Sequence, residues 1–156
     1  MGEELTHLTE SGEVHMVNVS EKADTSREAE AEAIVAMSEP TRRLLFSGGG
    51  PKGDALAAAR LAGIMAAKRT PDLIPLAHPL RLDAARVDLA EVEEGVRIVA
   101  TVTTRGPTGV EMEAMTAAAV AALTLYDMVK GVERGVEIRN VRLMLKRGGR
   151  SGEWVR

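Results

Sequence analysis

Cysteine is absent from this sequence of 156 residues, and aromatic side chains are almost absent. Without cysteine the protein has no disulfide, no thiol nucleophile and no thiolate metal site. Only Phe46, Tyr126 and Trp154 are aromatic, so the stacking platforms of single-stranded nucleic-acid binders are missing. The formal net charge of -3 adds no attraction to a phosphate backbone. We therefore do not expect nucleic acid as a partner.

Long hydrophobic runs are also lacking. The longest uncharged run, residues 114–126, is well short of the ~20 residues that span a bilayer. The N-terminus has no basic and apolar pattern typical of a signal peptide. We expect a cytoplasmic protein that crosses no membrane. Because the three histidines do not have metal-ligand spacing, we expect no metal site. We also expect no cofactor.

The composition that remains is typical of a globular protein, with 45% hydrophobic and 28% charged residues. The core must be built from Ala, Val, Leu, Ile and Met. The length predicts a single domain over residues 1–156, with flexible ends at about 1–12 and 148–156.

Hydrophobic periodicity and turn residues predict the secondary structure. We expect a strand at 14–19, a helix at 27–37 capped by Ser26, a short helix at 41–46, a helix at 54–69, strands at 86–92 and 96–104, a helix at 111–132, and a strand at 136–146 with a bulge near Asn140. This order predicts an α+β fold, a ferredoxin-like βαββαβ subunit with an additional N-terminal helix and an antiparallel four-stranded sheet. Both long helices are apolar over more than one face, which predicts burial against other subunits.

A polar stripe follows the helix expected at 111–132. At 100° per residue, one sector of about 120° contains Glu113, Thr116, Leu123, Thr124, Asp127 and Lys130. Glu113 and Asp127 are fourteen residues apart, or about 21 Å along the axis, so they cannot pair. The stripe is either the solvent face, with Asp127 and Lys130 as an ordinary surface pair, or the wall of a long cleft.

Lysine is scarce, with five residues against fifteen arginines. The five are Lys22, Lys52, Lys68, Lys130 and Lys146. An ammonium group suits proton transfer and phosphate neutralisation, although codon bias explains the same scarcity. In GGGPKG, Lys52 stands before a helix N-terminus, in either an anion-binding loop or a plain capping loop. His78, between two prolines, is either a structural residue or a residue whose ring makes one hydrogen bond in a fixed direction.

Three long motifs point further: DALAAARLAGIMAAKRTPDLIPLAHPL, TGVEMEAMTAAAVAALTLYDMVKGV and VRLMLKRGGRSG. Together they resemble the cyclic pyranopterin monophosphate synthase family, the C protein of molybdenum cofactor biosynthesis, from about Leu5 to Gly152. The resemblance implies a lyase that converts 3',8-cyclo-7,8-dihydroguanosine 5'-triphosphate to cyclic pyranopterin monophosphate and expels pyrophosphate. It also implies a hexamer, a trimer of ferredoxin-like dimers with sites between subunits.

The resemblance also implies site residues. Asp127 matches the family's catalytic acid, and Lys52 and Lys130 match its catalytic lysines. The segments that bind substrate match Leu76, Ala77, His78, Glu111, Met112 and Glu113. Arg27 and Lys68 match cationic positions near the substrate phosphates. We further expect Glu113 to read the guanine edge.

The sequence departs from the common family pattern at two positions. Ala77 replaces a frequent cysteine, which removes any role for a thiol, and Pro51 replaces a second basic residue before Lys52. Two other functions stay open from the residues alone: a non-catalytic nucleotide-triphosphate-binding module on the same oligomeric scaffold, and a structural assembly subunit.

Overall fold

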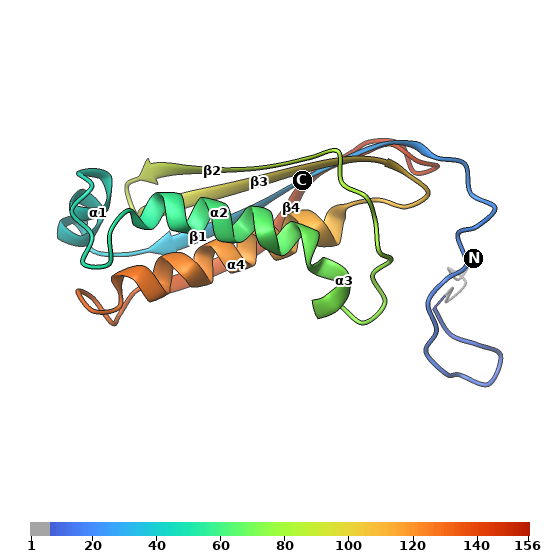
Figure 1. Ribbon diagram of the computed structural model, residues 1–156, viewed down its shortest axis with the longest axis horizontal. Helices are drawn as coiled ribbons and strands as arrows, with labels where there is room; N and C mark the ends of the chain where they lie inside the picture. Colours follow the sequence, from blue (N-terminus) through green and yellow to red (C-terminus); the bar gives the residue numbers. More distant parts are fainter. Residues whose placement is uncertain (1–6) are drawn as a thin grey trace.

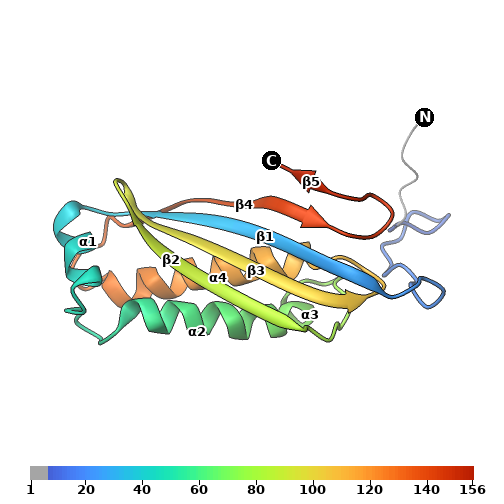
Figure 2. The ribbon, with the colours of Figure 1, turned by 90° about the horizontal axis from the view of Figure 1, so that it is seen from above.

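The computed structural model describes residues 7–156, in which a five-stranded antiparallel sheet is covered on one face by helices (Figures 1 and 2). In chain order the elements are β1 (Thr25–Ala36), α1 (Glu39–Phe46), α2 (Ala55–Lys68), α3 (Thr70–Leu73), β2 (Ala84–Val92), β3 (Gly95–Gly106), α4 (Glu111–Val129), β4 (Glu137–Arg147) and β5 (Trp154–Val155). The strand order is β2-β3-β1-β4-β5. Figure 2 shows the other sheet face without a helix over it.

The predicted α+β, ferredoxin-like fold is confirmed. β1, α2, β2, β3, α4 and β4 form the βαββαβ unit, with β1 between β3 and β4. Two short helices, α1 and α3, flank α2 in the first connection, so the extra helix of the prediction lies there. The short β5 pairs with β4 and adds a fifth strand. The predicted flexibility of the two ends stays a prediction, and residues 1–6 lie outside the described part of the chain.

The predicted helix at 27–37 is wrong, because this segment is the central strand β1. Ala29, Ala31, Ala33 and Val35 alternate toward the helices and are fully buried. On the open face Glu32 is also buried, between Arg97 of β3 and Arg142 of β4. Alanine and glutamate favour a helix locally, but pairing with strands on both sides overrides that weak preference.

The predicted strand at 14–19 is also wrong. Its apolar and polar residues alternate, but within residues 7–156 its only pairing is an isolated bridge between Leu8 and Val14. No strand of this described part accepts its hydrogen bonds. Instead Val17 and Val19 line a cavity described below. The alternation thus reflects contact with a cavity on one side and solvent on the other.

The bulge expected near Asn140 is confirmed. In the β1–β4 pairing the register shifts between Ile34, opposite Asn140, and Val35, opposite Ile138, which leaves Arg139 unpaired. A second shift leaves Met144 unpaired. The Asn140 side chain accepts a hydrogen bond from the Ile34 backbone at 2.9 Å, so it occupies the gap in the ladder.

The helices α2 and α4 pack closely against each other because Gly63 stands at their contact. A Cβ at this position would lie 2.9 Å from the Ala117 carbonyl oxygen and 3.2 Å from the Ala121 Cβ. The buried residues of α4 beneath the sheet are mostly alanine, with Leu125 and Val129. By length and composition α4 alone among the described helices could cross a membrane, and half of it is buried in this core.

Apolar side chains remain on the outer faces of the two long helices. Leu61 and Met65 of α2 and Leu123 of α4 are each more than half exposed. A single exposed apolar residue is common on protein surfaces. These three lie on α2 and α4, whose outer sides the sheet does not cover. They are part of the apolar surface for which the sequence predicts burial against other subunits, and that burial stays a prediction.

Candidate functional site

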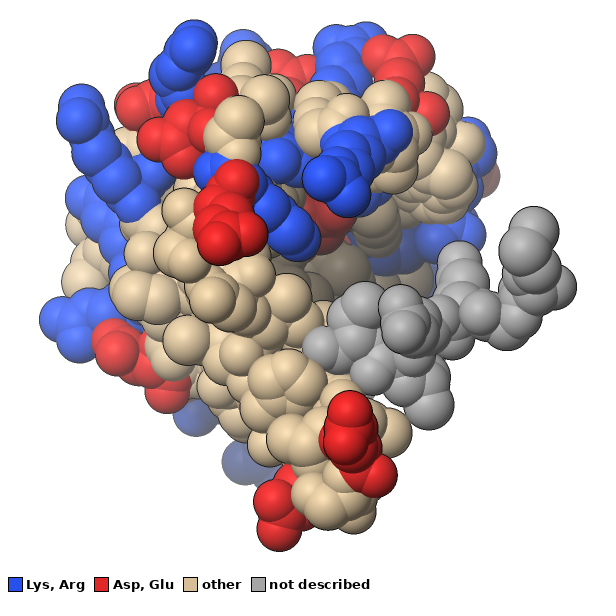
Figure 3. Space-filling model, turned by 90° about the vertical axis from the view of Figure 1, so that its right-hand side faces the viewer, with Lys and Arg blue, Asp and Glu red and all other residues tan. Residues whose placement is uncertain are grey.

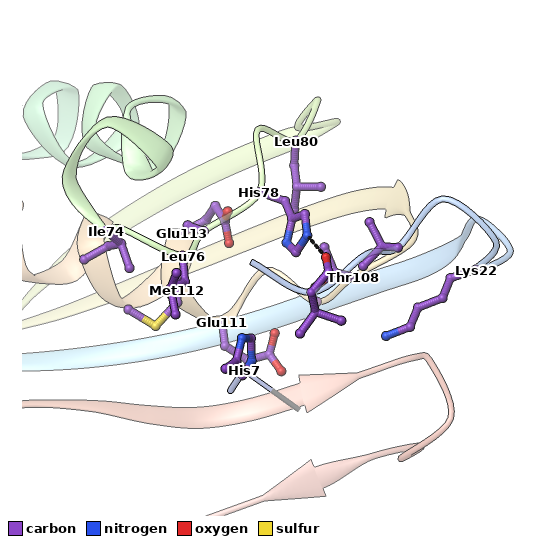
Figure 4. Close-up of a pocket in the computed structure, with 14 residues that line it drawn as sticks. His7, Lys22, Ile74, Leu76, His78, Leu80, Thr108, Glu111, Met112 and Glu113 are labelled. Carbon is purple, nitrogen blue, oxygen red and sulfur yellow. Dashed lines mark hydrogen bonds between the residues drawn. The ribbon is translucent and has the colours of Figure 1, made fainter. Parts of the chain in front are cut away.

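A cavity of about 500 Å³ opens at the N-terminal end of α4. It is lined by all six residues expected to bind substrate through the LAHP and EME motifs: Leu76, Ala77, His78, Glu111, Met112 and Glu113. The N-terminal segment closes another side with Val17, Val19 and Lys22. Figure 4 shows Lys22 at one end of the cavity and Ile74, Leu76 and Met112 at the other. The cavity wall is therefore mainly apolar, with a few polar groups.

His78 is held in one orientation. Its Nε2 lies 2.7 Å from the carbonyl oxygen of Val17, the contact drawn as a dashed line in Figure 4. Since a carbonyl only accepts, Nε2 carries the proton and donates it. Of the two alternatives open from the sequence, the geometry has the fixed hydrogen bond. It fixes the N-terminal segment against the loop that contains Leu76 and Ala77.

Glu113 is the buried acid of this cavity, with only 4% of its surface exposed. It belongs to the first turn of α4. Burial raises the pKa of Glu113, and the nearby Glu111 raises it further, while its own backbone N–H and His78 act in the opposite direction. A carboxyl group at this position can accept paired hydrogen bonds from a ligand that enters the cavity.

A second cavity, of about 690 Å³, adjoins the first and shares Lys22, Thr108, Gly109 and Glu111 with it. Its four basic residues are Lys22, Arg27, Lys146 and Arg150. Lys146 pairs with Glu111 at 2.7 Å. Figure 3, which faces this end of the molecule, shows Lys and Arg side chains gathered on the sheet side of a hollow. This cavity suits an anionic group.

Arg27 is directed by the glycine-rich tail. Its Nη2 donates to the carbonyl oxygen of Pro107 at 3.2 Å. Gly149 has φ of 75°, and a Cβ there would lie 2.0 Å from Arg27 Nη1. Any residue other than glycine at position 149 would displace the guanidinium. Arg27 can therefore adopt this orientation only because residue 149 has no side chain.

Asp127 forms two ion pairs at the C-terminal end of α4. One carboxylate oxygen lies 3.0 Å from Lys52 Nζ, and the other lies 2.8 Å from Lys130 Nζ. All three side chains are about half exposed. The hydrogen bonds from Lys130 and then Lys52 lower the pKa of Asp127, and Asp127 in turn raises the pKa of Lys130. At neutral pH the group is one carboxylate between two ammonium ions.

The site residues expected from the sequence thus fall into two groups at opposite ends of α4. Glu113 of the cavity group and Asp127 of the ion-pair group are fourteen residues apart, or about 21 Å along the axis of α4. Within one subunit the structure does not bring them together. Lys68 is exposed in the last turn of α2 and lines neither cavity.

The family model described as "MoaC family" matches residues 16–149, which include the ion-pair group and every lining residue of the two cavities except His7, Arg150 and Ser151. The chain belongs to the MoaC family.

Two relatives are similar to this MoaC family chain over almost its whole length. A cyclic pyranopterin monophosphate synthase of Corynebacterium glutamicum strain R is 56% identical over 150 residues, or 96% of each chain. The protein of the same name from Corynebacterium glutamicum strain ATCC 13032 is 56% identical over 151 residues, or 97% of each chain. The resemblance found in the sequence motifs is therefore confirmed.

Some cavity residues of this MoaC family chain were not expected from the motifs. Val17 and Val19 were assigned to a strand, and Lys22, Lys146 and Arg150 had no assigned role. The scarcity of lysine was a usable signal for two of them, since Lys22 and Lys146 belong to the set of five. Only the folded chain places them beside Arg27. In residues 7–156 no three His, Asp or Glu side chains gather as metal ligands would.

The raised pKa of Glu113 predicts a gain in stability from Glu113→Gln. Below the usual glutamate pKa the side chain is neutral in both states, and the two proteins should have similar melting temperatures. As the pH rises through the raised folded-state pKa, the wild type loses stability because the buried group ionises, while glutamine does not. At pH 8 we expect a Tm increase on the order of 2 °C, measured by calorimetry at pH 4 and pH 8. Glu137→Gln, at an exposed position, should leave Tm unchanged, and an equal gain at both pH values would contradict the burial argument.

Proposed function

We propose that this chain is a cyclic pyranopterin monophosphate synthase, which converts 3',8-cyclo-7,8-dihydroguanosine 5'-triphosphate to cyclic pyranopterin monophosphate and pyrophosphate. The observation that carries the proposal is the pairing of two adjoining cavities in a MoaC family chain. One is apolar with a buried acid, and the other contains four basic side chains. Such a pair matches a purine that carries a triphosphate.

The apolar cavity takes the purine in this proposal. Leu76, Ala77 and Met112 supply apolar walls, and Glu113 accepts hydrogen bonds from the guanine edge. The backbone of the loop at 76–78 is fixed through His78 and Val17, so the cavity is formed before substrate enters. Glu113→Gln should therefore weaken substrate binding more than it slows the bound substrate.

The basic cavity takes the phosphates. Arg27 is the phosphate ligand that the sequence motifs supplied, and Lys22, Lys146 and Arg150 join it in the fold. Cations here stabilise the negative charge that develops as pyrophosphate leaves. Lys68, exposed at the end of α2, lines neither cavity, so its role near the phosphates stays a prediction from the family resemblance.

The ion-pair group performs proton transfer. To close the cyclic phosphate, a substrate hydroxyl attacks the α-phosphorus, its O–H bond breaks, and the bond to the pyrophosphate oxygen breaks as the new P–O bond forms. The proton needs an acceptor. Asp127 is held as a carboxylate by Lys130 and Lys52, so we assign acceptance of a proton to Asp127 and stabilisation of negative charge to the two lysines.

A second copy of the chain completes the site. The ion-pair group lies about 21 Å from Glu113, too far to act on a purine bound in the cavity of its own subunit. The exposed apolar residues of α2 and α4 provide contact surface for another subunit. We propose a hexamer built as a trimer of dimers, in which one subunit supplies the cavities and its neighbour supplies Asp127, Lys52 and Lys130. A cytoplasmic location stays a prediction.

The direct test is an assay of pyrophosphate and pterin with purified protein and the cyclic triphosphate. Both products should appear in equal amounts. A protein that only binds nucleotide would return the substrate unchanged, and a structural subunit would show no ligand-dependent rise in Tm.

A further inference from the structure

The segment that carries Lys52 is attached to the end of α4 at both of its ends. At one end, Lys52 Nζ lies 3.0 Å from Asp127. At the other, the backbone N–H of Ser38 donates to both carboxylate oxygens of Glu133, at 3.2 and 3.1 Å, and Ser38 Oγ donates to one of them at 2.8 Å. Figure 1 shows α1 at the same end of the molecule as the C-terminal end of α4.

Glu133 supplies the hydrogen-bond acceptor at the N-terminus of α1 that a helix normally takes from its own N-cap side chain. Ser38 is the N-cap of α1, but its side chain makes no capping bond to its own helix. The carboxylate of Glu133 comes instead from the turn after α4, where the Glu133 N–H donates to the Val129 carbonyl at 3.1 Å. A negative charge is favoured at a helix N-terminus. Hydrogen bonds from Thr41, and then from Ser38, outweigh partial burial and keep the pKa of Glu133 below its usual value.

The position of Lys52 depends on the placement of α1, because the loop that carries this lysine follows directly from that helix. Arg42 ties the helix to the β2–β3 hairpin through Glu91 at 2.8 Å, so α1 stays on the sheet without Glu133. Between α1 and α2 the chain runs through Gly48, Gly49, Gly50 and Gly53, two of them with positive φ. The backbone N–H groups of Gly48 and Gly49 donate to Leu45 and Leu44 at the end of α1, and that of Gly53 donates to Gly50. The path of the loop therefore follows the placement of α1.

We propose that Glu133 is a positioning residue for Lys52: by linking Ser38 to the turn after α4, it sets where the glycine-rich loop places the lysine beside Asp127. The inference rests on the proposed catalytic role of Lys52. Nothing in it requires Glu133 to touch substrate. Its effect passes through α1 and the loop.

Glu133→Gln keeps the shape of the side chain and removes its charge. We expect kcat for pyrophosphate release to fall by about tenfold or more, because a small displacement of a reacting group is costly. KM should change little, since the cavities lie at the other end of α4. The matched control is Glu94→Gln. Glu94 lies in the β2–β3 hairpin and pairs with Arg139 of β4, and its carboxylate makes no hydrogen bond to Ser38. Equal kcat for the two variants would overturn the proposal.

A second substitution separates positioning from simple capping. Ser38→Asp supplies a carboxylate at the N-cap itself, which stabilises α1 without linking it to α4. The single variant Glu133→Gln should have a lower Tm because α1 loses the carboxylate at its N-terminus. In the double variant Glu133→Gln/Ser38→Asp, Tm should return to the wild-type value while kcat stays low. If kcat recovers together with Tm, Glu133 is only a helix cap and the proposal is wrong.

Amide hydrogen exchange in the protein without substrate gives a readout that does not depend on activity. Glu133→Gln should increase exchange in residues 47–53 and leave α2 and α4 unchanged, whereas Glu94→Gln should not. Unchanged exchange in residues 47–53 would overturn the inference. A different outcome is faster exchange in the Glu133→Gln protein together with full activity of a separate Lys52→Ala protein. That outcome would refute the catalytic role proposed for Lys52, and with it the catalytic part of the inference.

Discussion

Replacing Asp127 with asparagine should lower kcat for cyclic pyranopterin monophosphate formation by about 10²- to 10⁴-fold, the range that general acid–base groups contribute. The amide keeps the shape of the side chain but cannot accept the substrate proton as a carboxylate does. Because its partners Lys52 and Lys130 are about half exposed, the lost ion pairs should change Tm little. Pyrophosphate release and pterin fluorescence, measured at saturating substrate, report the loss.

The control is Asp88→Asn, which removes another carboxylate that pairs with a basic residue, here Arg86 at 2.7 Å on β2. Its kcat should match that of the wild type. An Asp127→Asn protein with kcat within twofold of the wild type, and with unchanged oligomeric state, would show that the proton leaves by another route.

Mixing two inactive variants should restore activity, because each site is proposed to take its two groups of residues from different subunits. One variant is Asp127→Asn, and the other is Arg27→Ala/Lys146→Ala, which removes two cations of the basic cavity. Co-expressed with different tags and purified through both, they should give hexamers with roughly a quarter of the wild-type sites intact, as random pairing of subunits predicts. The readout is pyrophosphate release per subunit.

The same mixture made from two Asp127→Asn proteins with different tags is the control and should stay inactive. If the site lay within one chain, the mixed hexamers would contain no intact site. Absence of recovery in assemblies that contain both chains would therefore contradict the intersubunit arrangement and leave the assignment of the two cavities untouched.

The sequence predicted the fold class and most of its elements, and it erred where one pattern allows two structures. REAEAEAIVA has the composition of a helix and the alternation of a strand. Only the neighbouring strands β3 and β4, far away in the sequence, decide between them, because they supply the hydrogen-bond partners of β1. For 14–19 no partner strand is found among the residues that the structure describes, and the same kind of alternation is not accompanied by a strand there.

The candidate site, too, was predicted in part from the sequence and in part only seen in the fold. Motif resemblance identified the residues of the LAHP and EME segments and the pair Asp127 and Lys130, and the structure places these side chains in a cavity and in an ion-pair group. Lys52, which lies in the glycine-rich loop between α1 and α2 and pairs with Asp127, is 75 residues away from it in the sequence. The basic cavity combines Lys22, Arg27, Lys146 and Arg150 from both ends of the chain, a set that no local spacing connects.

By itself, then, the sequence determined which chemical groups this protein has: no thiol, few lysines, an acid at the start of α4 and an acid with a base at its end. These follow from composition and from the helical period, which are local properties. The tertiary structure decided which groups meet and in which charge state. Burial raises the pKa of Glu113, and two lysines lower that of Asp127, because both effects depend on neighbours that only the packing of distant segments provides.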